Sequence, residues 1–308
     1  MSSTSESILV TGAAGQVDGI GGRVVGLLLA SSQSVRALVR RDDARAAHLR
    51  EQGAEVVVGD LTRPEDLVPA LRGCKRIYFG MSVSPAYLEA TLVVASAARA
   101  ARDLEILVNM SQMTVSEMDL IHSTESPQHR LHWLCEQALN WSGLPVTHVR
   151  PTVFQEHFFF SSWALESIEK SGTLRLPFGQ ARTSPVAASD VAEVTAKILL
   201  HPTDYVGKIL ELTGPRSATL NELANEYASG LGCPVQYEDV PFGVWLDELR
   251  QRDLPDHLYR HFLTMAKLLH RDGRYDRFTR TVETILGHQP ASLVESLTTA
   301  RHRSLRGY

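Results

Sequence analysis

A strand, a glycine-rich turn and a helix follow one another at the start of the chain. Residues 8–10 form a short apolar run, Gly12 and Gly15 make a Gly-x-x-Gly turn, and residues 21–30 have the composition of a helix. Glycines let a backbone approach an anion closely, and the amino end of a helix offers free N–H groups and a partial positive charge. This order of elements is typical of a βαβ unit that binds a pyrophosphate.

The turn departs from the regular spacing of such a motif. A third glycine is expected at position 18, where this chain has Asp18, and Gly21 suits the third position better. Three additional residues therefore lengthen the loop, and Asp18 brings a carboxylate near the expected phosphate. Because like charges repel at short range, we expect that Asp18 points outward or that the cofactor binds differently or weakly.

An arginine follows the second predicted strand, residues 35–39. A site for NAD places an acid at this strand end to bind the ribose diol, whereas the planar guanidinium of an arginine pairs with a 2′-phosphate. Arg40 therefore predicts NADP(H) as the cofactor. The alternative is a solvated arginine paired with Asp42 or Asp43.

The first half of the chain alternates between apolar strands and helices. The expected strands are 8–10, 35–39, 55–58, 76–79, 106–110 and 146–149, and the helices between them are 21–30, 44–52, 64–71, 85–101 and 128–141. Apolar strands separated by helices indicate an α/β fold with a Rossmann-type doubly wound parallel sheet. We assign residues 1–153 to the dinucleotide-binding core. Residues 154–308 are expected to complete the sheet and to form a smaller, mostly helical substrate lobe.

The second half begins with an aromatic stretch, residues 154–163, which fits either the mouth of a pocket for a flat substrate or the core of the lobe. Asp190 is a plausible cap for a helix over residues 191–200, and a strand fits residues 208–212. Thr219 and Glu222 have the spacing of a capping box, so another helix should start there. The tail from residue 242 onward has a mostly helical pattern.

The bulk composition excludes several classes of protein. The net charge of −4 comes from interspersed acids and bases, so nucleic-acid binding is not expected. The chain has no apolar run long enough for a membrane span and no signal peptide, which indicates a cytoplasmic protein. The three scattered cysteines form no Cys-x-x-Cys pair, and no metal-binding motif is present.

The chain resembles the NmrA-like group of atypical short-chain dehydrogenases/reductases. The motifs that carry the resemblance are Val10-Thr11-Gly12-Ala13-Ala14-Gly15, Arg36-Ala37-Leu38-Val39-Arg40, Gly59-Asp60-Leu61, Gly143-Leu144-Pro145-Val146-Thr147, Arg150-Pro151, Ala188-Ser189-Asp190-Val191-Ala192 and Leu212-Thr213-Gly214-Pro215. The group contains NAD(P)H-dependent quinone and aromatic reductases, and also regulators that bind the cofactor without turning it over. The resemblance covers nearly the whole chain but does not name a substrate.

The resemblance also implies which residues line the cofactor. They are Gly12, Ala14, Gly15, Gln16 and Val17 at the pyrophosphate, Arg40 at the 2′-phosphate, Asp60 and Leu61 at the adenine, Gly80, Met81 and Ser82 at the ribose, and Met110, Ser111 and Pro151 to Phe154 at the nicotinamide. For Asp60 the alternative role is a cap for helix 64–71.

The usual proton donor of short-chain dehydrogenases is missing. These enzymes carry a Tyr-x-x-x-Lys pair on the helix after the fifth strand, and residues 128–141 contain neither tyrosine nor lysine. His132 lies four residues before Glu136, so this pair either binds the nicotinamide ribose and relays a proton or is a surface ion pair. Ser111 is either a substrate-orienting hydroxyl or a turn serine. His157 is a second candidate proton donor.

These observations favour an NADPH-dependent reductase that transfers hydride to a flat conjugated molecule such as a quinone or an enone, because such acceptors can take their proton from water or a modest donor. Two alternatives stay open. One is a non-catalytic NADP(H)-binding redox sensor, and the other is a non-redox cyclase or isomerase on the same fold. The expected partner is an aromatic or conjugated small molecule, and a homodimer is left open.

Overall fold

The computed structural model describes residues 6–15, 19–122, 126–270 and 273–298, with only the backbone described for residues 268–270. Gln16, Val17 and Asp18 lie outside the described residues. The chain divides into two compact units. The first comprises Met1–Met118, Gln128–Arg150 and Val191–Glu211, and the second comprises Asp119–Pro127, Pro151–Asp190 and Leu212–Tyr308.

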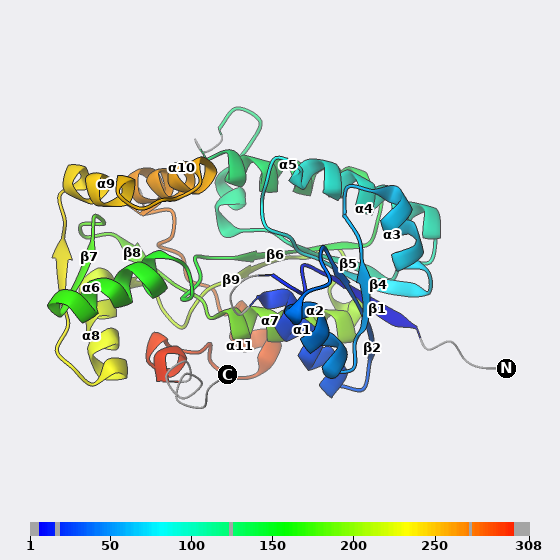
Figure 1. The fold of residues 1–308 in the computed structure, drawn as a ribbon, viewed down its shortest axis with the longest axis horizontal. Helices are drawn as coiled ribbons and strands as arrows, with labels where there is room; N and C mark the ends of the chain where they lie inside the picture. Colours follow the sequence, from blue (N-terminus) through cyan, green and yellow to red (C-terminus); the bar gives the residue numbers. More distant parts are fainter. Residues whose placement is uncertain (1–5, 16–18, 123–125, 271–272, 299–308) are drawn as a thin grey trace. The chain divides into compact units, whose positions relative to one another are not determined.

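A seven-stranded parallel sheet forms the centre of the first unit (Figure 1). Its strands lie in the order β3 (Glu55–Val58), β2 (Ser34–Val39), β1 (Ser7–Thr11), β4 (Cys74–Phe79), β5 (Ile106–Met110), β6 (Val146–Pro151) and β9 (Ile209–Leu212). In the register of the sheet, Val10 lies between Ala37 of β2 and Tyr78 of β4. The strand order reverses between β1 and β4, which is where open α/β sheets bind their ligands. The predicted doubly wound sheet is therefore confirmed.

Helices cover both faces of this sheet. They are α1 (Ile20–Ala30), α2 (Ala44–Glu51), α3 (Pro64–Leu71), α4 (Tyr87–Ala101), α5 (Pro127–Trp141) and α7 (Ala188–Leu200). Figure 1 shows α3, α4 and α5 along one side of the sheet and α1, α2 and α7 along the other. Leu9, Ile77 and Leu107 are fully buried between the layers. Burial of each such side chain stabilises the fold by about 1.5–3 kcal/mol.

The second unit has its own aromatic core. The unit contains two small sheets, β7 (Thr173–Leu176) with β11 (Gln236–Asp239) and β8 (Arg182–Thr183) with β10 (Ala218–Thr219). Its helices are α6 (Ala164–Ser171), α8 (Leu220–Leu231), α9 (Phe242–Arg250), α10 (Asp256–Thr264) and α11 (Thr281–Leu286). Phe159, Trp163 and Trp245 are buried at the centre of this core. These short strands are absent from the sequence-based expectation.

One predicted helix cap is wrong and another is confirmed. Helix α7 begins at Ala188, so Asp190 lies inside its first turn and accepts the backbone N–H of Ala291 instead (2.8 Å). The carboxylate of Glu156 accepts the N–H of Ala188 and so caps this helix. The capping box of α8 is present as predicted: Thr219 Oγ1 accepts the N–H of Glu222, and the Glu222 carboxylate accepts the N–H of Thr219.

Within the described ranges, no helix has the length and apolar character needed to cross a membrane.

Candidate functional site

The ends of β1 and β4 approach each other so closely that only glycine fits between them. Gly12 has a φ of +66°, and a β-carbon there would lie 2.4 Å from the carbonyl oxygen of Gly80. Thr11 Oγ1 donates to that oxygen (2.9 Å) and accepts the N–H of Gly80 (3.0 Å). Thr11 therefore holds the two strand ends together, a role that sequence reasoning missed because it attended to the glycines alone.

Helix α1 packs directly against this turn. A β-carbon on Gly21 would lie 2.7 Å from the carbonyl oxygen of Gly12, so Gly21 has the close helix–strand contact of a third motif glycine. The helix is preceded by Gly19, and no side chain of the described residues caps its first turn. The N–H groups at the amino end of a helix suit an anion, which fits a pyrophosphate.

Arg40 extends from the end of β2 into solvent, with 83% of its side chain exposed. The alternative partners are already engaged, since Asp42 binds Arg50 (2.7 Å) and Asp43 binds Arg45. The structure therefore leaves the Arg40 guanidinium accessible at the strand end where an acid or an arginine distinguishes the two dinucleotides.

Asp60 follows β3 and faces Arg40 at a distance of 3.8 Å between Oδ2 and Nε. The N–H and hydroxyl of Thr62 both donate to Asp60, and these hydrogen bonds, helped by Arg40, lower the pKa of the carboxyl group. Asp60 does not cap α3, because the residue at the start of that helix is Arg63, which provides no side-chain cap. Leu61 beside it is half-buried.

Ser111 lies directly after β5, where its N–H donates to the carbonyl of Val149 on β6 (2.8 Å). The side chain is buried. Its hydroxyl lies near the carboxylate of Glu136 on α5 and helps to lower the pKa of that group.

The carboxylate of Glu136 binds Arg150 rather than His132. Arg150 donates from Nε to Oε1 (2.9 Å) and from Nη2 to Oε2 (2.5 Å), and Glu136 is fully buried. Burial alone would raise the pKa of this carboxyl group. The hydrogen bonds and charge of Arg150, together with His148 and the Ser111 hydroxyl, outweigh burial, so the pKa is lowered. Both sequence-based alternatives paired Glu136 with His132, whereas its carboxylate binds Arg150 in a buried pair between α5 and β6.

His132 packs edge-on against the ring of Tyr87, with 5.0 Å between ring centres. Burial lowers the pKa of His132 to about 4, so the ring is neutral at pH 7. The hydroxyl of Tyr87 donates to the carbonyl of Met110 (3.2 Å), the last residue of β5. A relay through His132 at neutral pH would therefore start from the uncharged ring.

Several buried polar atoms in this region have no hydrogen-bond partner among the described residues. They are Gln112 Nε2, Gln128 Oε1 and His132 Nδ1. Each buried group left unpaired costs about 1–3 kcal/mol, so these atoms need a partner such as an ordered water or a bound ligand. The hydroxyls and the amide of a nicotinamide riboside are suitable partners. The residues after β5 and at the start of α5, together with the glycine turn, therefore fit a dinucleotide.

The remaining predicted residues divide between the two units. Gly80, Met81 and Ser82 follow β4 in the first unit, and Ser82 is exposed. Pro151, Phe154 and His157 belong to the second unit.

In that unit, His157 Nδ1 accepts the N–H of Phe159 (3.3 Å), and the His157 ring packs edge-on against Phe262. Much of the aromatic stretch after Phe154 forms the core of the second unit, because Phe159, Phe160 and Trp163 are buried there. The described residues contain no cluster of three or more histidine, cysteine or acidic side chains that could hold a metal ion.

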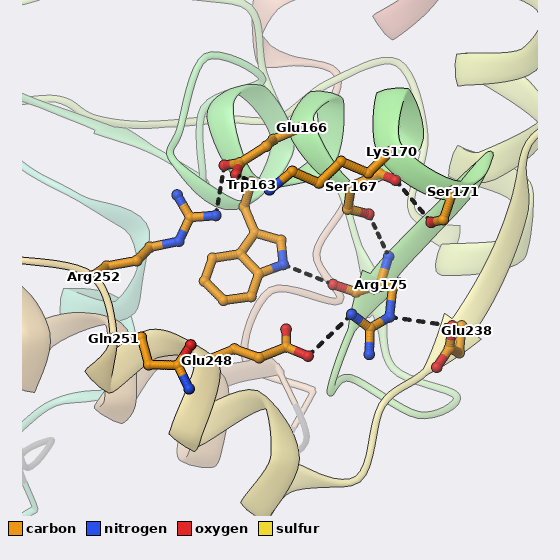
Figure 2. Close-up of a pocket in the computed structure, with 10 residues that line it drawn as sticks. All are labelled: Trp163, Glu166, Ser167, Lys170, Ser171, Arg175, Glu238, Glu248, Gln251 and Arg252. Carbon is orange, nitrogen blue, oxygen red and sulfur yellow. Dashed lines mark hydrogen bonds and ion pairs between the residues drawn. The ribbon is translucent and has the colours of Figure 1, made fainter.

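The second unit also has a charged cavity of about 650 Å³. Figure 2 shows that the charged side chains of its wall pair with one another: Lys170 and Arg252 with Glu166, and Arg175 with Glu238 and Glu248. Arg252 also lies over the ring of Trp163, 4.4 Å from its centre. Because these charges are satisfied internally, the cavity is a less suitable ligand site than the carboxyl edge of the sheet.

The order of the strands and the glycine-rich turn after β1 define a Rossmann-type α/β protein. The model of the NmrA-like family matches residues 4–302, and the chain belongs to this family. A similar curated protein is a (4-alkanoyl-5-oxo-2,5-dihydrofuran-3-yl)methyl phosphate reductase from Streptomyces griseus, 34% identical over 233 residues that cover 76% of this chain and 77% of that protein. An NAD(P)H azoreductase from Xenophilus azovorans is 28% identical over 82% of this chain and 83% of its own length.

Solved structures share the fold. The NADPH-dependent quinone oxidoreductase QOR2 of Escherichia coli, complexed with NADPH, has a TM-score of 0.81 at 24% identity, over 96% of this chain and 99% of that chain. NmrA, a negative transcriptional regulator in complex with NADP, has a TM-score of 0.79 at 15% identity, over 99% and 98% of the two chains.

Proposed function

We propose that this protein is an NADP(H)-dependent reductase that passes hydride to a flat, conjugated small molecule of the quinone or enone type. The observation that carries the proposal is the exposed guanidinium of Arg40 at the end of β2. This strand lies beside β1, whose glycine-rich turn fits a pyrophosphate. The reductase and azoreductase relatives support the reaction class.

The chain's own residues would bind and orient the reactants. The first turn of α1 and Gly12 hold the pyrophosphate, and Arg40 pairs with the 2′-phosphate. The cofactor, when bound, supplies the hydride. The buried hydroxyl of Ser111 offers a hydrogen bond to the acceptor oxygen, and the neutral ring of His132 offers one to a ribose hydroxyl.

The missing Tyr-x-x-x-Lys pair favours acceptors that need no strong acid. Helix α5 carries neither tyrosine nor lysine, and His132 is uncharged at neutral pH. A quinone or an activated alkene spreads the incoming charge over a conjugated system and can take its proton from water. A simple ketone gains more from a positioned acid, so we expect it to be a poor substrate.

The test is an assay of the purified protein with NADPH and a panel of quinones, enones and simple ketones. We expect the absorbance of the reduced nicotinamide to fall with the conjugated acceptors and not with the ketones. No loss of absorbance across the panel would overturn the proposal.

A non-catalytic redox sensor is the second candidate, favoured by the same absence of the Tyr-x-x-x-Lys pair from α5. A sensor must bind NADPH and NADP⁺ with different affinities, because a ligand pair with equal affinities cannot shift a conformational equilibrium. Titration of the protein with each form distinguishes the two: unequal affinity without turnover favours the sensor, and turnover favours the reductase.

A further inference from the structure

The side-chain amide of Gln112 is held at one end only. Gln112 follows Ser111 after β5, and its Oε1 accepts two hydrogen bonds from Thr114, one from the backbone N–H (3.1 Å) and one from Oγ1 (2.6 Å). Because a backbone N–H can only donate, the amide atom that faces it is the oxygen and not the nitrogen. The orientation of the amide is therefore fixed by Thr114.

The other end of this amide has nothing to bind. Gln112 Nε2 is buried and has no hydrogen-bond partner in the part of the chain that the structure describes. An unpaired buried N–H group is costly, and it is rarely kept without a use. Thr114, which orients the amide, is itself buried, so the donor cannot easily turn away.

Gln112 follows the carboxyl end of β5, at the ligand-binding edge of an open α/β sheet. Strand β5 pairs with β4, which together with β1 forms the point where the strand order reverses. In open α/β sheets the ligand lies beyond the carboxyl ends of these strands. A fixed N–H donor there can stabilise negative charge that develops during a reaction, since it needs no reorganisation when the charge appears.

We propose that Gln112 is a catalytic residue whose Nε2–H donates a hydrogen bond to the carbonyl oxygen of the conjugated substrate. This inference rests on the proposed reductase function. Hydride from NADPH forms a new C–H bond at the conjugated carbon, and the displaced electron pair moves to the carbonyl oxygen as an enolate. One proton from water completes the reduction and leaves NADP⁺ and hydroxide. Gln112 stabilises the oxyanion and keeps its own protons.

The test is Gln112→Glu, which keeps the shape of the side chain and an oxygen for the two bonds from Thr114 but loses the donor. We expect kcat to fall by about 100-fold at pH 7.5, the effect of removing one donor to an oxyanion, while the affinity for NADPH changes less than threefold. As the pH falls toward 5, the buried carboxyl group gains a proton and becomes a donor again. The variant should then recover kcat relative to the wild-type protein, which a purely structural role would not produce.

Ser116→Ala is the matched control, because the Ser116 hydroxyl lies in the same turn and donates to the carbonyl of Met113. Its kcat should equal that of the wild type, and the unfolding midpoints of both variants show whether each is folded. A folded Gln112→Glu protein with kcat within twofold of the wild type would overturn the role of Gln112 alone. A wild-type protein that binds NADPH but reduces no acceptor would overturn the reductase function, and this inference with it.

Discussion

Glu136 and Arg150 form a buried, bidentate ion pair that joins the middle of α5 to the end of β6. Glu136 is fully buried, and only 11% of the Arg150 side chain is exposed. Removing one member of such a pair leaves the other charge unpaired in the interior, which costs about 3–5 kcal/mol. We therefore expect Glu136→Gln to lower the free energy of unfolding by about that amount, as measured by urea denaturation.

The double variant Glu136→Leu with Arg150→Met shows how much of the lost stability comes from the unpaired charge and how much from the loss of the ion pair itself. It removes both charges and keeps apolar volume, so most of the lost stability should return. If the free energy of unfolding of Glu136→Gln lies within 1 kcal/mol of the wild-type value, the two charges are not tightly coupled.

Two glycines of α1, Gly21 and Gly26, allow a matched test of the close contact between this helix and the glycine-rich turn. A β-carbon on Gly21 would lie 2.7 Å from the carbonyl oxygen of Gly12, whereas a β-carbon on Gly26 would meet nothing within 4 Å. Gly21→Ala should push α1 away from β1, lower stability by about 1–3 kcal/mol and weaken NADPH binding at least tenfold. Gly26→Ala should add about 0.5–1 kcal/mol of stability by its better helix propensity and leave NADPH binding unchanged.

Fluorescence titration with NADPH and urea denaturation measure both effects. Equal behaviour of the two alanine variants would show that the close contact at Gly21 does not shape the cofactor site.

The strands of the large sheet could be predicted from the sequence because they are short runs rich in apolar residues, many of them buried, as in the middle of β1 and the end of β4. The short strands of the second unit could not. β8 and β10 have two residues each, and β11 is mostly exposed, so no periodic pattern exists to detect. These strands are fixed by tertiary packing and not by local preference.

The same limit applies to the candidate site. The spacing of four residues drew attention to His132 as the partner of Glu136, yet the carboxylate binds Arg150, 14 residues further along the chain. Only the register of α5 against β6 brings those two groups together. Gln112 Nε2 has no partner within the described ranges, and this too has no sequence signature, because it depends on how Thr114 orients the amide.

Arg40 should determine the choice between the two dinucleotides. Arg40→Gln removes the charge that would pair with the 2′-phosphate, and a charge-assisted hydrogen bond of this kind contributes about 1.5–3 kcal/mol. We expect the Kd for NADPH to rise at least tenfold while the Kd for NADH stays unchanged. Arg99→Gln, in the last turn of α4, is the control for a general loss of positive charge. A parallel loss of affinity for both dinucleotides would show that Arg40 acts on a shared part of the cofactor.

His132 should make the protein less stable in mild acid. Burial lowers the pKa of His132 from 6.5 to about 4, so between these values the unfolded chain binds a proton that the folded protein does not. Stability therefore falls as the pH drops from 6.5 toward 4, and the loss from this one group reaches as much as about 3 kcal/mol.

In His132→Gln the free energy of unfolding, measured in urea at pH 7 and pH 5, should change less with pH than in the wild type. A residual slope is expected from His148, whose pKa is also lowered by burial. His257→Gln, at an exposed position, should keep the wild-type slope. If His132→Gln loses as much stability between pH 7 and pH 5 as the wild type, the ring is not buried in its neutral form.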